Sequence, residues 1–393
     1  MSARAFINGR IHSPQGWRDG QALLCESGLV KAIVPQGDPG LRGAETVDLD
    51  GRLLLPGFID LQVNGGGGVL FNDHPDVAGI AAIGAAHARY GTTGFLPTLI
   101  SDRIERIAQG IAAVDESMAA GLPGVLGIHI EGPFLSEARK GVHKAGLLQE
   151  LEPTQVALLT SLRRGRTLLT LAPERASSEV LQALHEAGVV LAGGHSNASA
   201  DEIERARRHG LSGFTHLFNA MSQLTAREPG VVGAALLADD CWCGIIVDGR
   251  HVDPRVLRLA LRTHPHERFV LVTDAMPCVG TDDREFLLQG RRIHVSDGYC
   301  VDDRGTLAGT ALDMSRCVRN AISMLGLDPL LAVRMASEFP ADFIGLGASH
   351  GRLAAGYRAD VVAVDAQYHV TGTWIGGRTP AEHAADHRKE HAA

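Results

Sequence analysis

The stretch VVLAGGHSNASADEIERARRHGLSGFTHL, residues 189–217, contains one complete repeat of strand, helix and strand. Its two apolar runs, Val189–Ala192 and Gly213–Leu217, are short and rich in apolar residues, as is typical of buried parallel strands. Between them, Asp201–Arg208 has the spacing of an amphipathic helix, and Gly210 supplies a stop signal. A strand followed by a helix and a second strand predicts a parallel sheet.

The same alternation extends to both sides of this stretch. Helix-length amphipathic segments separate the strand-like runs, among them Val77–Tyr90, Ile104–Ala120 and Glu179–Ala187. The eight runs are Leu53–Val63, Gly94–Leu99, Val125–Ile130, Thr167–Leu171, Val189–Ala192, Gly213–Leu217, Cys243–Val247 and Phe269–Thr273. Eight strands with intervening helices predict an α/β fold, the (β/α)₈ TIM barrel.

Both ends of the chain have the character of β structure. Short strands with turns precede Leu55, and the strand-like segments Asp360–Asp365 and His369–Ile375 lie near the other end. We therefore expect residues 1–53 and 351–393 to pair into a small β-sandwich domain, and residues 54–350 to form the barrel.

Four further segments lie after the eighth run. Alternating residues predict a hairpin around Arg292–Val301. Asp313–Leu325 and Pro329–Ser337 have the apolar spacing of helices that pack against the outside of a barrel. The polar, His-rich tail Thr379–Ala393 predicts a solvated, frayed helix.

Length, charge and composition exclude some classes of binding partner and some locations in the cell. The length of 393 residues suits a barrel of about 250 residues with a smaller companion. A formal net charge of −8 without a Lys/Arg run argues against nucleic acid or an anionic membrane as the main partner. No apolar run is long enough for a bilayer, the N-terminal residues lack a secretory signal, and the six cysteines lack framework spacing. We expect a cytoplasmic protein with reduced thiols.

Four ionisable side chains stand at predicted C-terminal strand ends, where this fold gathers its catalytic groups. Glu131 follows the third run, and His195 and His216 lie at the ends of the fifth and sixth. Asp274 follows the eighth. Two imidazoles and one carboxylate suit a catalytic divalent metal with a position left for water. The fourth group can stay off the metal and move protons.

Each of these residues alone is a weak signal, because most histidines are surface or satisfied core residues and an Asp after a strand is usually a helix cap. Their coincidence at four strand ends carries the hypothesis. We expect His129, two residues before Glu131, to be structural support rather than a ligand. Gly65–Gly68 lacks the pattern of a phosphate-binding loop and predicts a flexible loop.

A series of motifs follows in order along nearly the whole chain. The motifs are Gln62-Val-Asn64-Gly-Gly-Gly-Gly68, Glu131-Gly-Pro-Phe134, Gly194-His-Ser-Asn197, His216-Leu-Phe-Asn-Ala-Met221, Arg227-Glu-Pro-Gly230, Asp248-Gly-Arg-His251-Val-Asp253, Val272-Thr-Asp-Ala275 and Gly305-Thr-Leu-Ala-Gly309. Together they resemble the motifs of the N-acetylglucosamine-6-phosphate deacetylases, which are amidohydrolases. The resemblance implies hydrolysis of the acetamido group of N-acetyl-D-glucosamine 6-phosphate to D-glucosamine 6-phosphate and acetate, a step of amino sugar metabolism.

The resemblance also implies a role for each site residue. Glu131, His195 and His216 would hold the metal. Asp274 would be the catalytic acid and base, and His143 a catalytic residue near the acetyl carbonyl. The implied substrate-binding residues are Val142, His143, Asn219, Ala220, Arg227, His251, Leu307, Ala308 and Gly309.

The expected metal content follows from one departure from the wider pattern. Binuclear amidohydrolases carry His-x-His at the end of the first strand, where this chain has Gln62-Val-Asn64. Amides are poor transition-metal ligands beside imidazole. We expect one divalent ion per subunit, with Zn²⁺ as the first choice and Fe²⁺, Co²⁺ and Mn²⁺ also accepted by a His₂Glu set.

A phosphorylated substrate needs a local cluster of donors on a chain of this negative charge. Arg227 offers a planar fork for phosphate, and backbone N–H groups at Asn219 and Ala220 would add donors. The resemblance implies a homodimer in which His251 helps to complete the phosphate site of its own or the neighbouring subunit. The adjacent Arg250 is a further candidate because of its charge alone.

Two alternatives stay open. The chain could be another barrel amidohydrolase, acting on N-acetylgalactosamine 6-phosphate or on a cyclic amide; the choice between the two sugar epimers depends on one or two loop contacts that sequence does not resolve. A non-catalytic relative could keep the barrel as a binding protein, although retention of all four ionisable groups argues against it.

Overall fold

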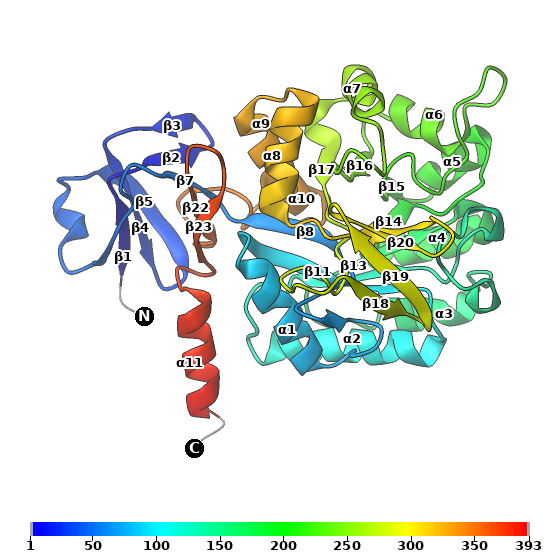
Figure 1. The fold of residues 1–393 in the computed structure, drawn as a ribbon, viewed down its shortest axis with the longest axis horizontal. Helices are drawn as coiled ribbons and strands as arrows, with labels where there is room; N and C mark the ends of the chain where they lie inside the picture. The colour runs from blue at the N-terminus through cyan, green and yellow to red at the C-terminus, as the bar shows by residue number, and fades with distance from the viewer. Residues whose placement is uncertain (1–2, 391–393) are drawn as a thin grey trace.

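The structure is a computed structural model that describes residues 3–390. It consists of a large α/β barrel and a smaller β unit beside it, into which both ends of the chain lead (Figure 1). Eight parallel strands form the barrel in the order β17-β16-β15-β14-β13-β12-β11-β8. A parallel bridge between Val63 and Ala275 brings the ends of the first and last strands together. The predicted TIM barrel is confirmed.

Each barrel strand overlaps one of the predicted runs. The strands are β8 (Phe58–Val63), β11 (Thr92–Ile100), β12 (Gly127–Glu131), β13 (Arg166–Leu171), β14 (Val190–Gly193), β15 (Leu211–Phe214), β16 (Trp242–Ile245) and β17 (Phe269–Leu271). Nearly all of their residues are buried, because helices cover the outside and side chains fill the inside.

Helices follow the strands around the barrel, as the spacing predicts. They are α1 (Val77–Ala88), α2 (Ile104–Ala119), α3 (Pro153–Leu159), α4 (Ser178–Glu186), α5 (Ala200–Arg208), α6 (Gly230–Leu237), α7 (Pro254–Thr263) and α8 (Met314–Leu325). Helix α5 begins at a capping box in which Ser199 and Glu202 satisfy each other's backbone N–H groups. Helix α8 ends at Gly326, whose φ of 71° is the left-handed conformation of a helix stop.

The terminal segments form two packed sheets, which confirms the β-sandwich. One sheet has the order β5-β4-β1-β6 and the other β23-β22-β7-β2-β3. Phe6 of the first packs edge-on against Trp374 of the second, with ring centroids 4.9 Å apart. The strands are β1 (Arg4–Ile7), β2 (Arg10–Ser13), β3 (Gly16–Arg18), β4 (Gln21–Glu26), β5 (Leu29–Pro35), β6 (Glu45–Asp48), β7 (Leu53–Pro56), β22 (Val361–Val364) and β23 (Val370–Trp374).

The first predicted run, Leu53–Val63, is divided between the two units. Its first part is β7, which pairs with β2 and β22 of the sandwich, and its second part is the barrel strand β8. The chain therefore passes from one unit to the other at Gly57, between the two strands. We propose the division expected from the sequence, residues 1–53 with 351–393 and residues 54–350, with its first boundary moved to Gly57 because β7 pairs with strands of the sandwich.

An antiparallel sheet, β18-β19-β20-β21, follows the last barrel strand and lies across the barrel in Figure 1, in yellow. Its strands are β18 (Glu285–Leu288), β19 (Arg291–Ser296), β20 (Tyr299–Asp302) and β21 (Leu307–Thr310). The expected hairpin around Arg292–Val301 is its central pair. Thr310 of β21 forms a bridge to Ala275, so this sheet is tied to the loop that follows the last barrel strand.

The remaining elements are short. They are β9 (Gly65–Gly66), β10 (Val69–Leu70), α9 (Pro329–Met335), α10 (Glu338–Phe343), α11 (Pro380–Glu390) and the 3₁₀ turns η1 (Pro39–Leu41), η2 (Glu137–Arg139), η3 (Ala145–Leu147), η4 (Pro173–Arg175) and η5 (His266–Arg268). Helix α11 lies in the predicted tail, whose last three residues are outside the described part. Across residues 3–390, we find no helix with the length and apolar character needed to cross a bilayer.

Candidate active site

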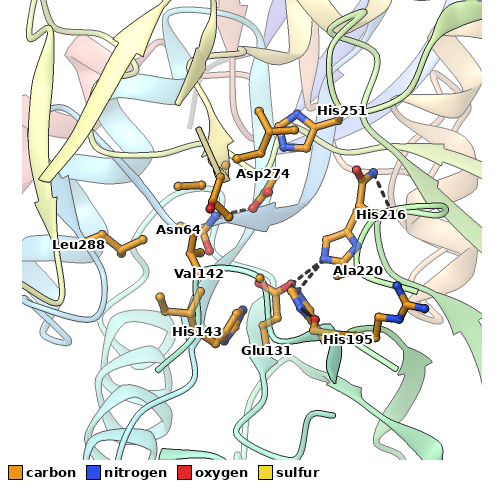
Figure 2. Close-up of a pocket in the computed structure, with 18 of the residues that line it drawn as sticks. Asn64, Glu131, Val142, His143, His195, His216, Ala220, His251, Asp274 and Leu288 are labelled. Atoms are coloured by element: carbon orange, nitrogen blue, oxygen red, sulfur yellow. Dashed lines mark hydrogen bonds and ion pairs between the residues drawn. The ribbon is translucent and has the colours of Figure 1, made fainter. Parts of the chain in front are cut away.

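A pocket with a volume of about 350 Å³ opens at the C-terminal ends of the barrel strands and extends under the β18–β21 sheet. It gathers nearly every predicted site residue (Figure 2). Those lining it are Glu131, Val142, His143, His195, His216, Asn219, Ala220, His251, Asp274, Leu307, Ala308 and Gly309. The apolar side chains of Ile100, Met276 and Leu288 complete the pocket wall on the side of the β18–β21 sheet.

Glu131, His195 and His216 converge on one point of this pocket. Glu131 Oε1 lies 3.2 Å from His195 Nε2 and 3.0 Å from His216 Nε2, and the two Nε2 atoms are 3.1 Å apart. Ligand atoms around a tetrahedral metal with bonds of about 2.0 Å lie about 3.3 Å apart, close to these distances. In the part of the chain that the structure describes, this is the one group of three such residues that could hold a metal ion.

The backbone at these strand ends is unusual. His195, His216 and Asp274 have φ values of 49°, 35° and 52°, in the left-handed region that non-glycine residues rarely adopt. Each comes just after its strand has ended, where the chain turns sharply and the side chain is directed into the pocket. Strain of this kind persists only where the surrounding structure holds it, and it concentrates at functional sites.

One histidine is oriented by the loop that follows β12. His195 Nδ1 lies 2.9 Å from the carbonyl oxygen of Arg139, so the Nδ1–H donates there and Nε2 is left free to bind a metal. Burial by itself raises the pKa of Glu131, but hydrogen bonds from His195 and His216 outweigh it and hold that pKa well below its usual value. The donor set and its geometry therefore fit a divalent cation.

Asp274, which follows the last barrel strand β17, faces the Glu131, His195 and His216 side chains. Two amide side chains at the end of the first barrel strand, β8, hold its carboxylate. Asn64 Nδ2 donates to Asp274 Oδ1 over 2.6 Å, and Gln62 Nε2 over 3.2 Å. Gln62 Nε2 also lies 3.2 Å from Glu131 Oε1, so one amide spans both carboxylates. Burial, and then the charge of Glu131, raise the pKa of Asp274 to about 6. A carboxyl tuned in this way is suited to proton transfer near neutral pH.

The carbonyl oxygen of Asp274 is closely approached by Gly309, which has a φ of 75°. A Cβ atom at this position would lie 2.8 Å from that oxygen and 2.6 Å from Met276. The site thus requires glycine here for space as well as for conformation.

His143 lies on the opposite side of the pocket from His216 (Figure 2). Its Nδ1 is 2.7 Å from Ser101 Oγ, and its ring packs against that of His195 with centroids 4.5 Å apart. Burial, and then His195, lower the pKa of His143 to about 3, so this imidazole is neutral. A neutral imidazole can donate a hydrogen bond to a carbonyl oxygen without carrying charge into the pocket.

The far end of the pocket contains His251 and Ala220. His251 Nδ1 is 2.6 Å from Asp248 Oδ2, which fixes the ring so that it lines the pocket of its own chain. The Asn219 N–H donates to the carbonyl of His216, so it is not the free backbone donor that the sequence suggested. Arg250 lies outside the pocket lining, with its guanidinium 5.0 Å from the ring centroid of Tyr299.

Arg227, like Arg250, is a predicted site residue that the structure does not bring to this pocket. It is exposed on the loop between β15 and α6 and is absent from the pocket lining. Its neighbour Glu228 does not pair with it; that carboxylate accepts from the N–H groups of Ala200 and Gly230. The Arg227 side chain is thus available to a molecule outside this chain.

Two interpretations of nearby residues can be compared with their contacts. His129 lies within the barrel, with Nδ1 3.1 Å from Thr98 Oγ1 and Nε2 2.7 Å from Thr170 Oγ1, which fits structural support. The Gly65–Gly68 segment is not a loose loop: β9 and β10 form a small hairpin, and Gly65 N–H donates to Ala275 O.

The sequence reasoning missed the part played by Gln62 and Asn64. Both were noted only as amides that replace metal ligands, whereas their N–H groups hold Asp274. Their alternate positions at the end of the first strand place both on one face, and that was the available signal. The carbonyl of Arg139, which orients His195, is a backbone group, and a sequence pattern does not indicate backbone contacts of this kind.

Comparisons with known proteins show the family of this chain. The amidohydrolase family matches residues 53–379. An N-acetylgalactosamine-6-phosphate deacetylase from a Shewanella species is 42% identical, with 82% of each chain covered. An N-acetylglucosamine-6-phosphate deacetylase from Haemophilus influenzae is 33% identical over 95% of this chain and 98% of its own. The crystal structure of the N-acetylglucosamine-6-phosphate deacetylase from Pasteurella multocida superposes with a TM-score of 0.92 at 35% identity, covering 95% and 98% of the two chains.

Proposed function

This chain belongs to the amidohydrolase family, and we propose that it removes the acetyl group of N-acetyl-D-glucosamine 6-phosphate by hydrolysis, releasing D-glucosamine 6-phosphate and acetate. The observation that carries this proposal is the placement of Glu131, His195 and His216 around one point, with Asp274 facing them in the same pocket. Relatives that are named N-acetylglucosamine-6-phosphate deacetylases match almost the full length of the chain. The combination also argues against a purely non-catalytic binding protein.

We propose that the three converging ligands hold one divalent cation per chain. Zn²⁺ is our first choice for a His₂Glu set with near-tetrahedral spacing, and Fe²⁺, Co²⁺ or Mn²⁺ are alternatives. When bound, such a cation polarises the acetyl carbonyl and makes water more acidic. Gln62 and Asn64 present N–H groups where a binuclear relative would have ligands, which favours a single ion.

Asp274 is the proton carrier in this proposal. Its carboxylate takes a proton from the attacking water, and the C–N bond of the amide then breaks as Asp274 returns that proton to the leaving nitrogen. The amine leaves neutral with one proton of the water, and the acetyl group leaves as acetic acid, which carries the water oxygen and releases the other proton to solvent to become acetate. Asn64 and Gln62 hold Oδ1 of Asp274, which leaves Oδ2 free for this transfer.

His143 and the residues around it would bind the acetyl end of the substrate. The neutral imidazole, steadied by Ser101, can donate to the carbonyl oxygen as negative charge develops on it. Val142 and Leu307 line the same pocket and provide apolar surface beside it.

The phosphate end would lie toward Ala220 and His251. Both residues line the pocket of their own chain, and the contact of His251 Nδ1 with Asp248 Oδ2 fixes the ring, so that its other nitrogen is left to bind an anion. A dianion requires more positive charge than one imidazole provides. We propose that Arg227, exposed on its loop, supplies it from a neighbouring subunit in a homodimer, and that His251 serves its own site.

A second candidate substrate is N-acetylgalactosamine 6-phosphate, because the Shewanella relative with this activity in its name is 42% identical. The two sugars differ only in the configuration at one hydroxyl. The test is to incubate the purified, cation-loaded protein with each sugar phosphate and to compare kcat/KM for acetate release. A higher value for the gluco epimer supports the main proposal, a higher value for the galacto epimer supports the alternative, and no acetate from either contradicts both.

We also propose a cytoplasmic location. All six cysteines are buried free thiols, which suits a reducing compartment.

A further inference from the structure

The barrel has a gap in its main-chain pairing between its first and last strands. Within the described chain, the hydrogen-bonded order begins at β17 and ends at β8, and the only β-bridge between the two ends joins Val63 and Ala275. Lower down, the N–H of Ile59 on β8 donates to the carbonyl of Ala336 instead of to β17. We call this junction of β8 and β17 the barrel seam.

A buried carboxylate, Asp60, occupies the seam at the level of the gap. It lies on β8 and is fully buried. Its Oδ2 accepts from the hydroxyl of Thr273 over 2.5 Å, and its Oδ1 lies 3.3 Å from the Thr273 N–H. The N–H of Gln62 on its own strand donates to the same Oδ1 over 3.2 Å. The Asp60 carboxylate, together with the Thr273 hydroxyl, which also lies 3.3 Å from the Gln62 carbonyl, thus links β8 to the segment after β17 where backbone pairing does not.

We propose that Asp60 is a positioning residue for the reaction, because its carboxylate closes the barrel seam and thereby fixes Asp274 against Gln62. Thr273 directly precedes Asp274, and Gln62 is the residue whose amide donates to Asp274. Both residues that Asp60 holds are therefore adjacent to, or in contact with, the proton carrier. This inference rests on the proposed function, in which Asp274 moves the proton.

Asp274 needs such support because of its backbone. Its φ of 52° lies in the left-handed region, which is uncommon for any residue other than glycine, and it is held by its neighbours. One support is Thr310, whose hydroxyl donates to the Thr273 carbonyl over 2.6 Å and whose N–H donates to the Asp274 carbonyl over 2.9 Å. Asp60 is the support on the opposite side, toward β8.

The alternative for a buried carboxylate of this kind is a purely structural role in the core. Burial raises the pKa of Asp60 to about 7, and hydrogen bonds from Thr273 and Gln62 oppose that rise. A buried carboxyl needs donors in either role, and the donors here come from Gln62, which contacts Asp274, and from Thr273, which precedes it. The arrangement of its three donors, all at residues next to the site, separates the positioning role from a filling role.

The test uses substitutions that keep the shape of the side chain. Asp60→Asn keeps its size but replaces one acceptor oxygen with an N–H donor. Thr273→Val removes the hydroxyl that Asp60 accepts, and Thr273→Ser keeps it. Asp115→Asn is the matched control, since Asp115 is also buried but lies on α2 and pairs with Arg163.

We expect Asp60→Asn and Thr273→Val each to lower kcat by roughly 10- to 100-fold, the scale of a small misplacement of a catalytic group, with little change in KM. The double variant should lose no more than the worse single variant, because both changes break the same link. Thr273→Ser and Asp115→Asn should stay within about threefold of wild type, and cation content should be equal in all. Amide hydrogen exchange at Thr273 should be faster in Asp60→Asn.

Wild-type kcat in both Asp60→Asn and Thr273→Val would overturn the proposal, as would losses that multiply in the double variant. If Asp60→Asn fails to fold, the proposal is tested by Thr273→Val and Thr273→Ser. A kcat that falls only in Thr273→Val supports it, and equal kcat values in the two variants overturn it. Should the wild type release no acetate from either sugar phosphate, the proposed function fails. The exchange of the Thr273 amide, compared between Thr273→Ser and Thr273→Val, would then still test the link across the seam.

Discussion

Replacing Asp274 by Asn should abolish nearly all turnover while leaving the rest of the pocket intact. The amide oxygen of the variant can take the place of Oδ1 and accept from Asn64 and Gln62. Its NH₂ group would then face the pocket where Oδ2 was, and it can donate a hydrogen bond but cannot accept a proton. The cation ligands Glu131, His195 and His216 are separate from this group, so cation content should not change.

The expected loss of kcat in Asp274→Asn follows from the role of Asp274 in general acid–base catalysis. General acid–base catalysis by a placed side chain contributes roughly 10²- to 10⁴-fold, which corresponds to about 3–5 kcal/mol of transition-state stabilisation. We expect kcat to fall by this factor and KM to change little, since the proposed contacts to the acetyl and phosphate ends remain. Substrate affinity measured by calorimetry on Asp274→Asn should be similar to the KM of the wild type.

The assay is acetate release under saturating substrate, with cation content and circular dichroism measured on the same samples. Asp73→Asn is the control for the chemical change itself, because Asp73 is exposed and lies outside the pocket lining. If Asp274→Asn retained its cation and worked within about tenfold of wild type, Asp274 could not be the proton carrier.

Four further outcomes are expected. Purified protein should contain one equivalent of divalent cation, and a chelator should remove activity that added Zn²⁺ restores; two equivalents, both needed, would disprove the single site. Activity should fall on the acid side as Asp274 becomes protonated; because a bound cation favours the carboxylate, the fall should lie at or below its pKa of about 6 in the ion-free protein, and an inflection well above neutrality would contradict this. Arg227→Ala should lower kcat/KM for the phosphorylated sugar far more than for free N-acetylglucosamine, and equal losses would exclude Arg227 from the phosphate site. Mixing Asp274→Asn chains with Arg227→Ala chains should restore activity on subunit exchange, whereas mixing with His251→Ala chains should not; the reverse pattern would assign the shared residue to His251.

The sequence predicted the barrel because its strands are buried and therefore leave short, uniformly apolar runs between amphipathic helices. It predicted Glu131, His195, His216 and Asp274 because the fold itself specifies that strand ends face the active site. The division of Leu53–Val63 was missed, since both halves are apolar and only the Pro56-Gly57 pair marks the change of sheet. Apolar character alone does not show which sheet a strand joins.

Contacts between distant residues set the limit of the sequence reasoning. Asn64 and Asp274 are 210 positions apart and meet only because the barrel closes, so no local pattern shows that an amide holds that carboxylate. The same is true of Asp60 and Thr273, which are 213 positions apart. Arg227 was predicted by resemblance to bind phosphate, but its exposed position shows that a single chain does not form such a contact.

The central claim is that this chain uses water to cleave the acetamido bond of N-acetyl-D-glucosamine 6-phosphate. It is tested most directly by running the reaction in water labelled with heavy oxygen and analysing the products by mass spectrometry. We expect acetate with one labelled oxygen, in an amount equal to the D-glucosamine 6-phosphate formed, and neither product from Asp274→Asn over the same time. Unlabelled acetate, or no acetate from the cation-loaded wild type, would contradict the claim.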